Sequence, residues 1–161
     1  MLDSALKINL LLVQYGRMLI SDIADEQMAE QPLPGVNHPA WVLGHLAFSA
    51  ELAGQLLGAA VELPETWKAL FGPGSKPSAV RADYPPKEEL WRAVEQGFER
   101  VRRRVEAATP EQLARPSTNP ALKDALPTVQ DMVAFLLTGH LGTHLGQLAT
   151  WRRMIGRPPL F

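Results

Sequence analysis

Apolar residues recur at helical spacing in four long segments of the chain, and connections rich in proline and glycine separate these segments. No segment shows the strict alternation of apolar and polar residues between hairpin turns that is typical of strands. The pattern therefore predicts an all-α fold, with helices over residues 2–30, 37–58, 87–108 and onwards from residue 128. A short helical turn is also expected around residues 67–71.

Local signals indicate where the predicted helices begin and end. The first helix should stop at the Pro-Leu-Pro-Gly stretch over residues 32–35, because proline does not continue a helix. Asn37 is expected to cap the second helix, with Pro39 tolerated in its first turn. Thr128 is expected to cap the fourth helix. The connection over residues 58–86 is long enough for the second and third helices to run parallel.

Apolar stripes on the helices predict which faces are buried. In the third helix the stripe is a seam in alternating steps of four and three residues: Leu90, Val94, Phe98, Val101 and Val105. In the second and fourth helices, histidines occupy stripe positions that packing alone would fill with leucine. His45 shares its stripe with Val42, Leu52 and Leu56, while His140 and His144 share theirs with Val133, Leu137, Leu148 and Trp151.

Composition narrows the class of protein further. A chain of 161 residues with 46% hydrophobic and 20% charged content has the size of one domain, predicted to span residues 1–161. The net charge of −1 gives no positive field for nucleic acid, so no nucleic-acid partner is expected. No apolar run is long enough to span a membrane, and no leader is evident, so a cytoplasmic protein is the default expectation.

The chain has no cysteine, which removes disulfides, thiolate metal ligands and a catalytic thiol of its own. Any thiol chemistry must therefore use a thiol from outside the chain.

Three of the four histidines, His45, His140 and His144, fall on apolar stripes that a small bundle brings face to face. His140 and His144 are four residues apart, about 6 Å along a helix and only about 40° around it, so both imidazoles can point at one ion. Three imidazoles buried without a shared ion would leave nitrogen atoms without partners. The sequence therefore predicts a three-histidine site for one divalent ion (Zn, Ni, Fe or Mn) with a coordination position left open.

Other residues near this site allow two readings each. His38 lies about 10.5 Å along the helix from His45, too far to share the ion, and either bonds nearby backbone or recognises a substrate at the mouth of the site. Gln147 either holds a ligand or a water beside the ion, or only bonds backbone. Gly139, Gly142 and Gly146 either leave space for substrate or allow close helix packing.

Two familiar metal motifs are missing. The segment from His140 to His144 lacks the glutamate of the H-E-x-x-H peptidase motif, so a thermolysin-like peptidase is not expected. Neither histidine helix carries the Glu-x-x-His pairs of di-iron bundles, which favours one metal ion over two. No catalytic base is identified.

The segments NHPAWVLGHLA (residues 37–47), HLGTHLGQL (140–148) and RRMIG (152–156) resemble the DinB/YfiT-like superfamily, and the resemblance spans nearly the whole chain. It implies a four-helix bundle with up-down-down-up connectivity, a long crossover between helices two and three, and frequent homodimers. It also implies a divalent metal ion held by His45, His140 and His144. Thr143 departs from the pattern, since an aromatic residue often precedes the last histidine.

Similar proteins include bacillithiol- and mycothiol-dependent S-transferases and a mycothiol-dependent maleylpyruvate isomerase. The leading hypothesis is therefore a metal-dependent enzyme in which the ion activates a low-molecular-weight thiol toward a small electrophilic substrate. A second hypothesis is hydrolysis by metal-bound water. A third is a non-catalytic dimeric bundle in which the ion only joins helices two and four.

Overall fold

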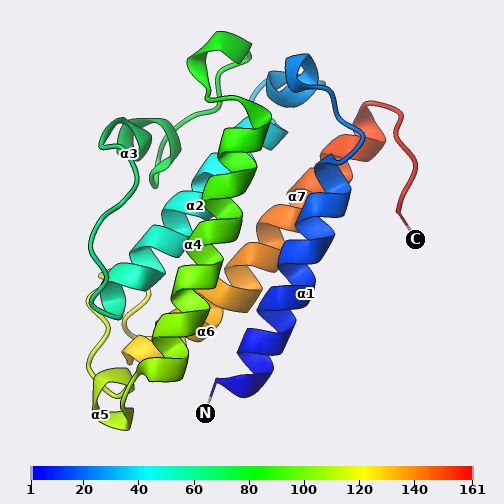
Figure 1. Ribbon diagram of the computed structural model, residues 1–161. Coiled ribbons are helices and arrows are strands. Elements are labelled where there is room, and N and C mark those ends of the chain that lie inside the picture. The colour runs from blue at the N-terminus through cyan, green and yellow to red at the C-terminus, as the bar shows by residue number, and fades with distance from the viewer. Residues whose placement is uncertain (1, 161) are drawn as a thin grey trace.

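The long helices form where the apolar periodicity predicts them. The computed structural model describes residues 2–160 (Figure 1), so Met1 and Phe161, the two ends of the predicted domain, lie outside the described residues. The α-helices are α1 (Asp3–Ile20), α2 (Pro39–Leu56), α3 (Thr66–Phe71), α4 (Lys87–Ala107), α5 (Pro110–Leu113), α6 (Val129–Phe135) and α7 (Leu141–Met154). Two 3₁₀ segments, η1 (Asp25–Ala29) and η2 (Arg81–Asp83), and one π-helical segment, η3 (Leu136–His140), complete the elements.

Helices dominate the described chain, and the all-α prediction is confirmed. Within residues 2–160 no strand forms beyond one isolated bridge between Pro116 and Thr128. None of the helices in this range combines the length and the hydropathy that crossing a membrane requires.

The four long rods are α1, α2, α4 and the combined α6-η3-α7 rod. Figure 1 shows α1 and α7 running in one direction and α2 and α4 running in the other. Two hydrogen bonds align α1 with the last rod: the Asn9 amide donates to the Leu137 carbonyl at 2.9 Å, and Arg152 donates to the Leu19 carbonyl at 2.8 Å. The connection over residues 57–86, which contains α3 and η2, brings the chain back to start α4 beside the beginning of α2.

The predicted seam of α4 is buried along its whole length, as are Trp91 and Gly97 beside it. It faces α2, which is apolar on nearly all sides because α3, α4 and the last rod surround it. Gly97 allows α4 to approach α2 closely, since a Cβ added at this position would lie 2.9 Å from the Ala50 Cβ. Small residues therefore set the distance between α2 and α4, and with it the position of His45.

The first helix ends at Ile20, ten residues before the predicted end, so the prediction of one helix over residues 2–30 is wrong. Long-range contacts stop it. Arg152 is 2% exposed and bonds both the Leu19 carbonyl and the Asp22 carboxylate, which holds the chain in a turn after Ile20. The Arg152 guanidinium also lowers the pKa of Asp22. The chain then continues through the 3₁₀ segment η1 rather than as an α-helix.

The cap of α2 also differs from the prediction. His38, not Asn37, is the N-cap residue, and its Nδ1 accepts a hydrogen bond from the Trp41 backbone N–H at 3.3 Å. His38 Nε2 donates to the Ser78 carbonyl at 2.8 Å, so the same ring fixes the long connection to the start of α2. His38 is fully buried, and the structural reading of this residue is the one that the contacts support.

The last rod begins as predicted but is not a regular helix. Thr128 and Asp131 form a reciprocal capping box at the start of α6. The rod then widens into the π-helical turn η3 and continues as α7. A π-helical turn inserts one extra residue into a helix and is frequent at functional sites. Here it ends at His140, so it determines the direction in which this side chain leaves the rod.

Candidate metal centre

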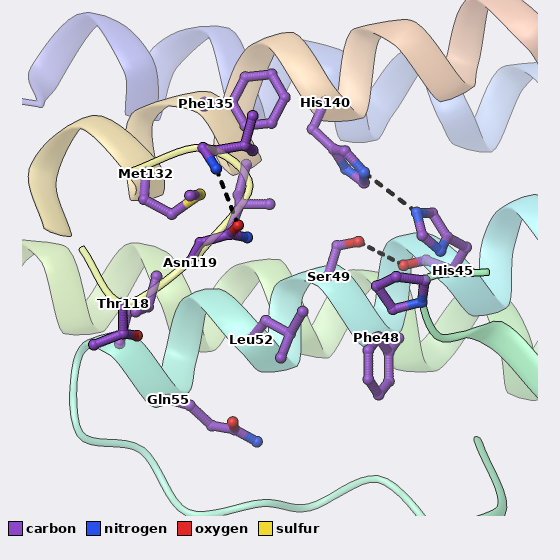
Figure 2. A pocket seen from close by; sticks show the side chains of 14 residues that line it. His45, Phe48, Ser49, Leu52, Gln55, Thr118, Asn119, Met132, Phe135 and His140 are labelled. Carbon is purple, nitrogen blue, oxygen red and sulfur yellow. Dashed lines mark hydrogen bonds between the residues drawn. The ribbon is translucent and has the colours of Figure 1, made fainter. Parts of the chain in front are cut away.

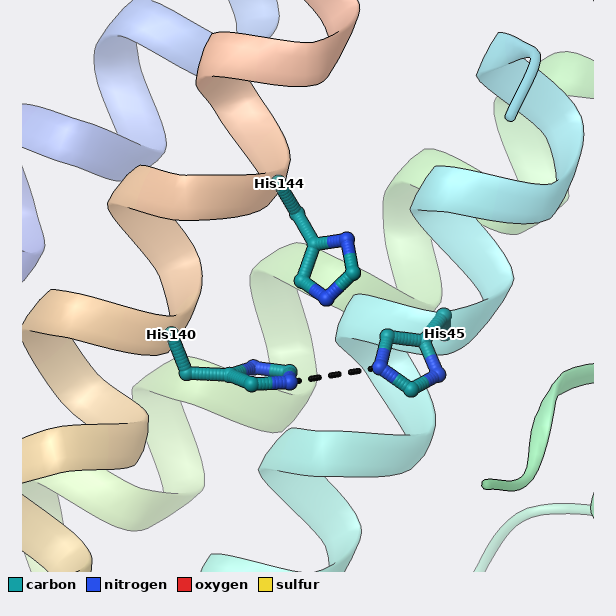
Figure 3. Close-up of side chains that lie close together, drawn as sticks. All are labelled: His45, His140 and His144. Atoms are coloured by element: carbon teal, nitrogen blue, oxygen red, sulfur yellow. Dashed lines mark hydrogen bonds between the residues drawn. The ribbon is translucent and has the colours of Figure 1, made fainter. Parts of the chain in front are cut away.

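The bundle brings together the side chains of His45, His140 and His144, as predicted from their stripes (Figure 3). One nitrogen from each ring lies within 4.8 Å of the other two. The Nε2 atoms of His45 and His140 are 3.2 Å apart, and the ring of His144 lies above the gap between them, with one nitrogen pointing into it. All three rings therefore face one point between α2 and the last rod.

His45 is held in position by a contact on one face and a hydrogen bond at one edge. Its Nδ1–H donates to the carbonyl oxygen of Phe71 at 2.7 Å, which leaves the lone pair of Nε2 facing the other histidines. The indole of Trp41, one turn earlier on α2, stacks on the imidazole with ring centres 4.8 Å apart and an interplanar angle of 7°. Both the tautomer and the ring plane of His45 are thus fixed.

Gly44 makes the contact with Phe71 possible. A Cβ at this position would lie 2.2 Å from Cε1 of Phe71, so only glycine lets the ring lie flat against α2. Phe71 is fully buried at the end of α3, and its carbonyl is the acceptor for His45. The short helix predicted around residues 67–71 therefore serves the site directly.

His144 has a side-chain partner rather than a backbone one. Its Nδ1–H donates to Oε1 of Gln147 at 3.0 Å, and the same oxygen accepts from the side-chain amide of Asn37 at 3.0 Å. Of the two readings of Gln147, orientation of a ligand is therefore the one that the structure supports. Asn37, expected as a cap, instead supports Gln147 from the start of α2.

His140 has no such partner. Among residues 2–160, its buried Nδ1 finds no hydrogen-bond acceptor or donor, and the Phe135 ring lies edge-on to the imidazole at 5.8 Å. A buried ring nitrogen without a partner costs free energy. The polar interactions of His140 are therefore concentrated at Nε2, the atom that faces the other two rings.

Burial keeps all three imidazoles neutral. It lowers the pKa of His140 and His144 to about 4, helped by the neighbouring histidines, and it also lowers the pKa of His45 despite the Phe71 carbonyl. A neutral imidazole has a lone pair available for a metal ion, whereas a protonated one does not. The site is therefore ready to bind a cation near neutral pH.

The donor set fits one divalent metal ion. Three neutral nitrogens converge, and two of the rings carry the outer hydrogen bonds that usually orient metal-bound histidines. Three protein ligands leave a position for a further ligand. His38, the fourth histidine, is excluded from this cluster by its own bonds to Trp41 and Ser78.

The helix glycines do not supply the open space beside the histidines. None of Gly139, Gly142 and Gly146 is among the described residues that line the cavity next to His45 and His140. A Cβ at Gly139 would press on Phe135 at 3.2 Å, so this glycine serves packing, whereas one at Gly142 would make only an ordinary contact with Leu12 at 4.0 Å. Thr143 also lies outside the cavity, where its hydroxyl donates to the Gly139 carbonyl at 2.8 Å.

Sequence reasoning missed Phe71, Gly44 and Trp41 as parts of the site. Phe71 acts through a backbone carbonyl, for which the residue type carries no signal. Gly44 is a helix-interior glycine next to a predicted ligand, and its roughly 1 kcal/mol cost relative to alanine was a usable signal. Trp41 lies four residues before His45, on the same helix face, and could have been found from this spacing.

The family model of the DinB superfamily matches residues 14–148, a range that includes all three histidines, and the chain belongs to this superfamily. No curated protein and no solved structure matches the chain significantly.

Proposed function

We propose that the chain holds one divalent metal ion on His45, His140 and His144 and acts as a metal-dependent enzyme on a small molecule. One observation carries this proposal: a cavity of about 540 Å³ opens directly beside the cluster, with His45 and His140 in its wall. This volume is in the range of small-molecule sites. A purely structural ion has a closed shell of protein ligands and needs no such space.

The roles of the protein groups follow from the contacts. Phe71 and Gln147 orient two of the imidazoles, and burial keeps all three unprotonated. The bound ion supplies Lewis acidity, which polarises a carbonyl or lowers the pKa of a thiol or water. The cavity walls shield a bound substrate from bulk water and hold it against the histidines.

We infer that the nucleophile is a thiol from outside the chain, which makes the reaction an S-transfer to a small electrophile. No carboxylate or amine lines the cavity among the described residues, so no side chain there is suited to take a proton from water. A thiol has an ordinary pKa of ~8.5 and loses its proton more readily than water. Zn, Ni, Fe and Mn all accept three imidazole ligands.

Rate measurements with each metal test this function. The chain is loaded in turn with Zn, Ni, Fe(II) and Mn and given bacillithiol, mycothiol or cysteine with 1-chloro-2,4-dinitrobenzene, so that a carbon–sulfur bond forms and chloride leaves. A rate above that of the free metal, lost in His140→Ala, is expected. The absence of any such rate contradicts the transfer function, while ester hydrolysis without thiol identifies a hydrolase instead.

A further inference from the structure

The cavity beside the histidines is a slot between α2 and the α6-η3 segment (Figure 2). One wall is a single face of α2, and the other is a face of α6 and η3. The residues that line it are His45, Phe48, Ser49, Leu52, Gln55, Leu56, Pro73, Thr118, Asn119, Leu122, Met132, Phe135, Leu136 and His140.

The slot is elongated and has a deep end and a mouth. His45 and Gln55 both line it and are ten residues apart on α2, which corresponds to about 15 Å of helix. At the deep end, His45 and Ser49 are buried. At the other end, Gln55 and Thr118 are exposed, so a ligand enters there and reaches inward to the histidines.

The middle of the slot is mainly apolar. Phe48 and Leu52 from α2 and Met132 and Phe135 from α6 supply most of this stretch, and the side chain of Asn119 lies between Leu52 and the α6 wall (Figure 2). Oδ1 of Asn119 is already bonded to the backbone amides of residues 121 and 122, so its amide nitrogen is the group that can face a ligand.

The lining carries no formal charge. None of the described side chains that form it is an aspartate, glutamate, lysine or arginine. A charged group moved from water into such surroundings loses its hydration without gaining an ionic partner. Away from the proposed metal ion, the slot therefore discriminates against charged groups and favours apolar ones.

We propose that the substrate is an elongated molecule with an uncharged and mainly apolar body. Its reacting group lies at the deep end beside His45 and His140, and its other end meets the uncharged polar groups Gln55 and Thr118 at the mouth. The choice of the reacting end rests on the proposed metal function. The preference for an uncharged apolar body rests on the walls alone.

Three eight-carbon probes of different charge test the walls without any metal: 1-octanol, octanoate and octylammonium. Binding to the metal-free protein is followed by NMR of methyl-labelled methionine, because Met132 lines the slot whereas Met18 and Met154 lie at the surface elsewhere. We expect 1-octanol to shift the Met132 signal and to bind at least tenfold more tightly than either ion. Equal binding of the three probes, or shifts confined to Met18 and Met154, overturns the proposal.

A matched pair of variants tests the role of charge. Leu52→Glu and Leu52→Gln place side chains of similar size on the partly exposed wall position, and only the first is charged. We expect octylammonium to bind Leu52→Glu at least tenfold more tightly than Leu52→Gln, as monitored at Met132. Leu11→Glu, on the 64% exposed surface of α1, adds the same charge outside the slot and should leave all three affinities unchanged. Equal affinities of octylammonium for the two Leu52 variants contradict the proposal.

Hydroxamates separate this inference from the metal function. With the metal-loaded protein, octanohydroxamate should bind at least tenfold more tightly than acetohydroxamate, because only the former fills the slot. Suberic monohydroxamate, with a terminal carboxylate, should lose much of this gain. If neither hydroxamate binds but 1-octanol still shifts the Met132 signal in the metal-free protein, the proposed metal function is wrong and the proposed ligand preference of the slot is supported. If acetohydroxamate binds and octanohydroxamate binds no more tightly, the proposed ligand preference of the slot is wrong and the metal site is supported.

Discussion

Replacing Gly44 with alanine should weaken metal binding through Phe71, without changing any of the three histidines. The added Cβ would lie 2.2 to 2.4 Å from three carbons of the Phe71 ring, whereas ordinary contact begins near 3.4 Å. The ring is fully buried and has no free space to turn into, so α3 must move away from α2 by about 1 Å. This movement stretches the 2.7 Å bond from His45 Nδ1 to the Phe71 carbonyl beyond the ~3.5 Å limit.

Two quantities should change together in Gly44→Ala. Overpacking of this kind costs about 1–3 kcal/mol of unfolding free energy in the metal-free protein. Loss of a hydrogen bond that orients a metal-binding histidine weakens metal affinity by about 10- to 100-fold. Denaturant titration measures the first quantity, and competition with a chelator of known affinity measures the second.

A second substitution shows whether the effect travels through the ring. Phe71→Leu shortens the side chain but keeps the backbone carbonyl, so the double variant Gly44→Ala/Phe71→Leu should regain most of the lost metal affinity. NMR should detect a slowly exchanging Nδ1 proton on His45 in the parent and in the double variant, but not in Gly44→Ala. If Gly44→Ala keeps the parent affinity and this proton signal, the proposed role of Phe71 is wrong.

Three further predictions concern the histidine pKa values, Gln147 and the pair formed by Arg152 and Asp22. Burial lowers the pKa of His140 and His144 to about 4, so between pH 6.5 and 4 the unfolded chain binds protons that the folded chain does not. The unfolding free energy of the metal-free protein should therefore fall as the pH is lowered through this window, and it should fall more steeply than that of His140→Ala. Parallel pH profiles of the parent and His140→Ala would contradict the lowered pKa values. Gln147→Ala removes the acceptor for His144 and should weaken metal affinity roughly tenfold in the chelator assay, with little change in stability; unchanged affinity excludes an orienting role. Asp22→Ala leaves the buried Arg152 guanidinium without its carboxylate and, because the Asp22 side chain is 43% exposed, should lower the unfolding free energy by about 1–2 kcal/mol. An unchanged unfolding free energy would show that the pair does not hold the turn.

Most of the fold could be predicted from patterns that repeat along the chain. The seam of Leu90 and Phe98 identified the buried face of α4, because side chains three and four residues apart share one side of a helix. The same periodicity placed His45, His140 and His144 on inward faces, and the structure brings them together. The positions of the three histidines on facing apolar stripes were thus sufficient to predict their cluster.

Contacts between distant segments account for what periodicity missed. The end of α1 depends on Arg152, which lies 130 residues after Asp22. The cap of α2 depends on the ring of His38, a residue type with no strong capping preference. The orientation of His45 depends on a backbone carbonyl from α3. None of these has a periodic signature.

The π-helical turn at Leu136–His140 is a further case. It inserts a residue between α6 and α7, yet the apolar residues on either side keep the spacing of one regular α-helix. Its effect on His140 is therefore visible only in the three-dimensional structure.

The metal content of the purified protein tests the central claim most directly. After loading with Zn, Ni, Fe(II) or Mn and removal of free ions, elemental analysis should find one divalent ion per chain in the parent protein and a large loss in His140→Ala. The matched control is His38→Asn, which replaces the fourth histidine by a good capping residue and should keep its metal. Full occupancy in His140→Ala, or no bound ion in the parent with any of the four metals, would contradict the proposed ligand set.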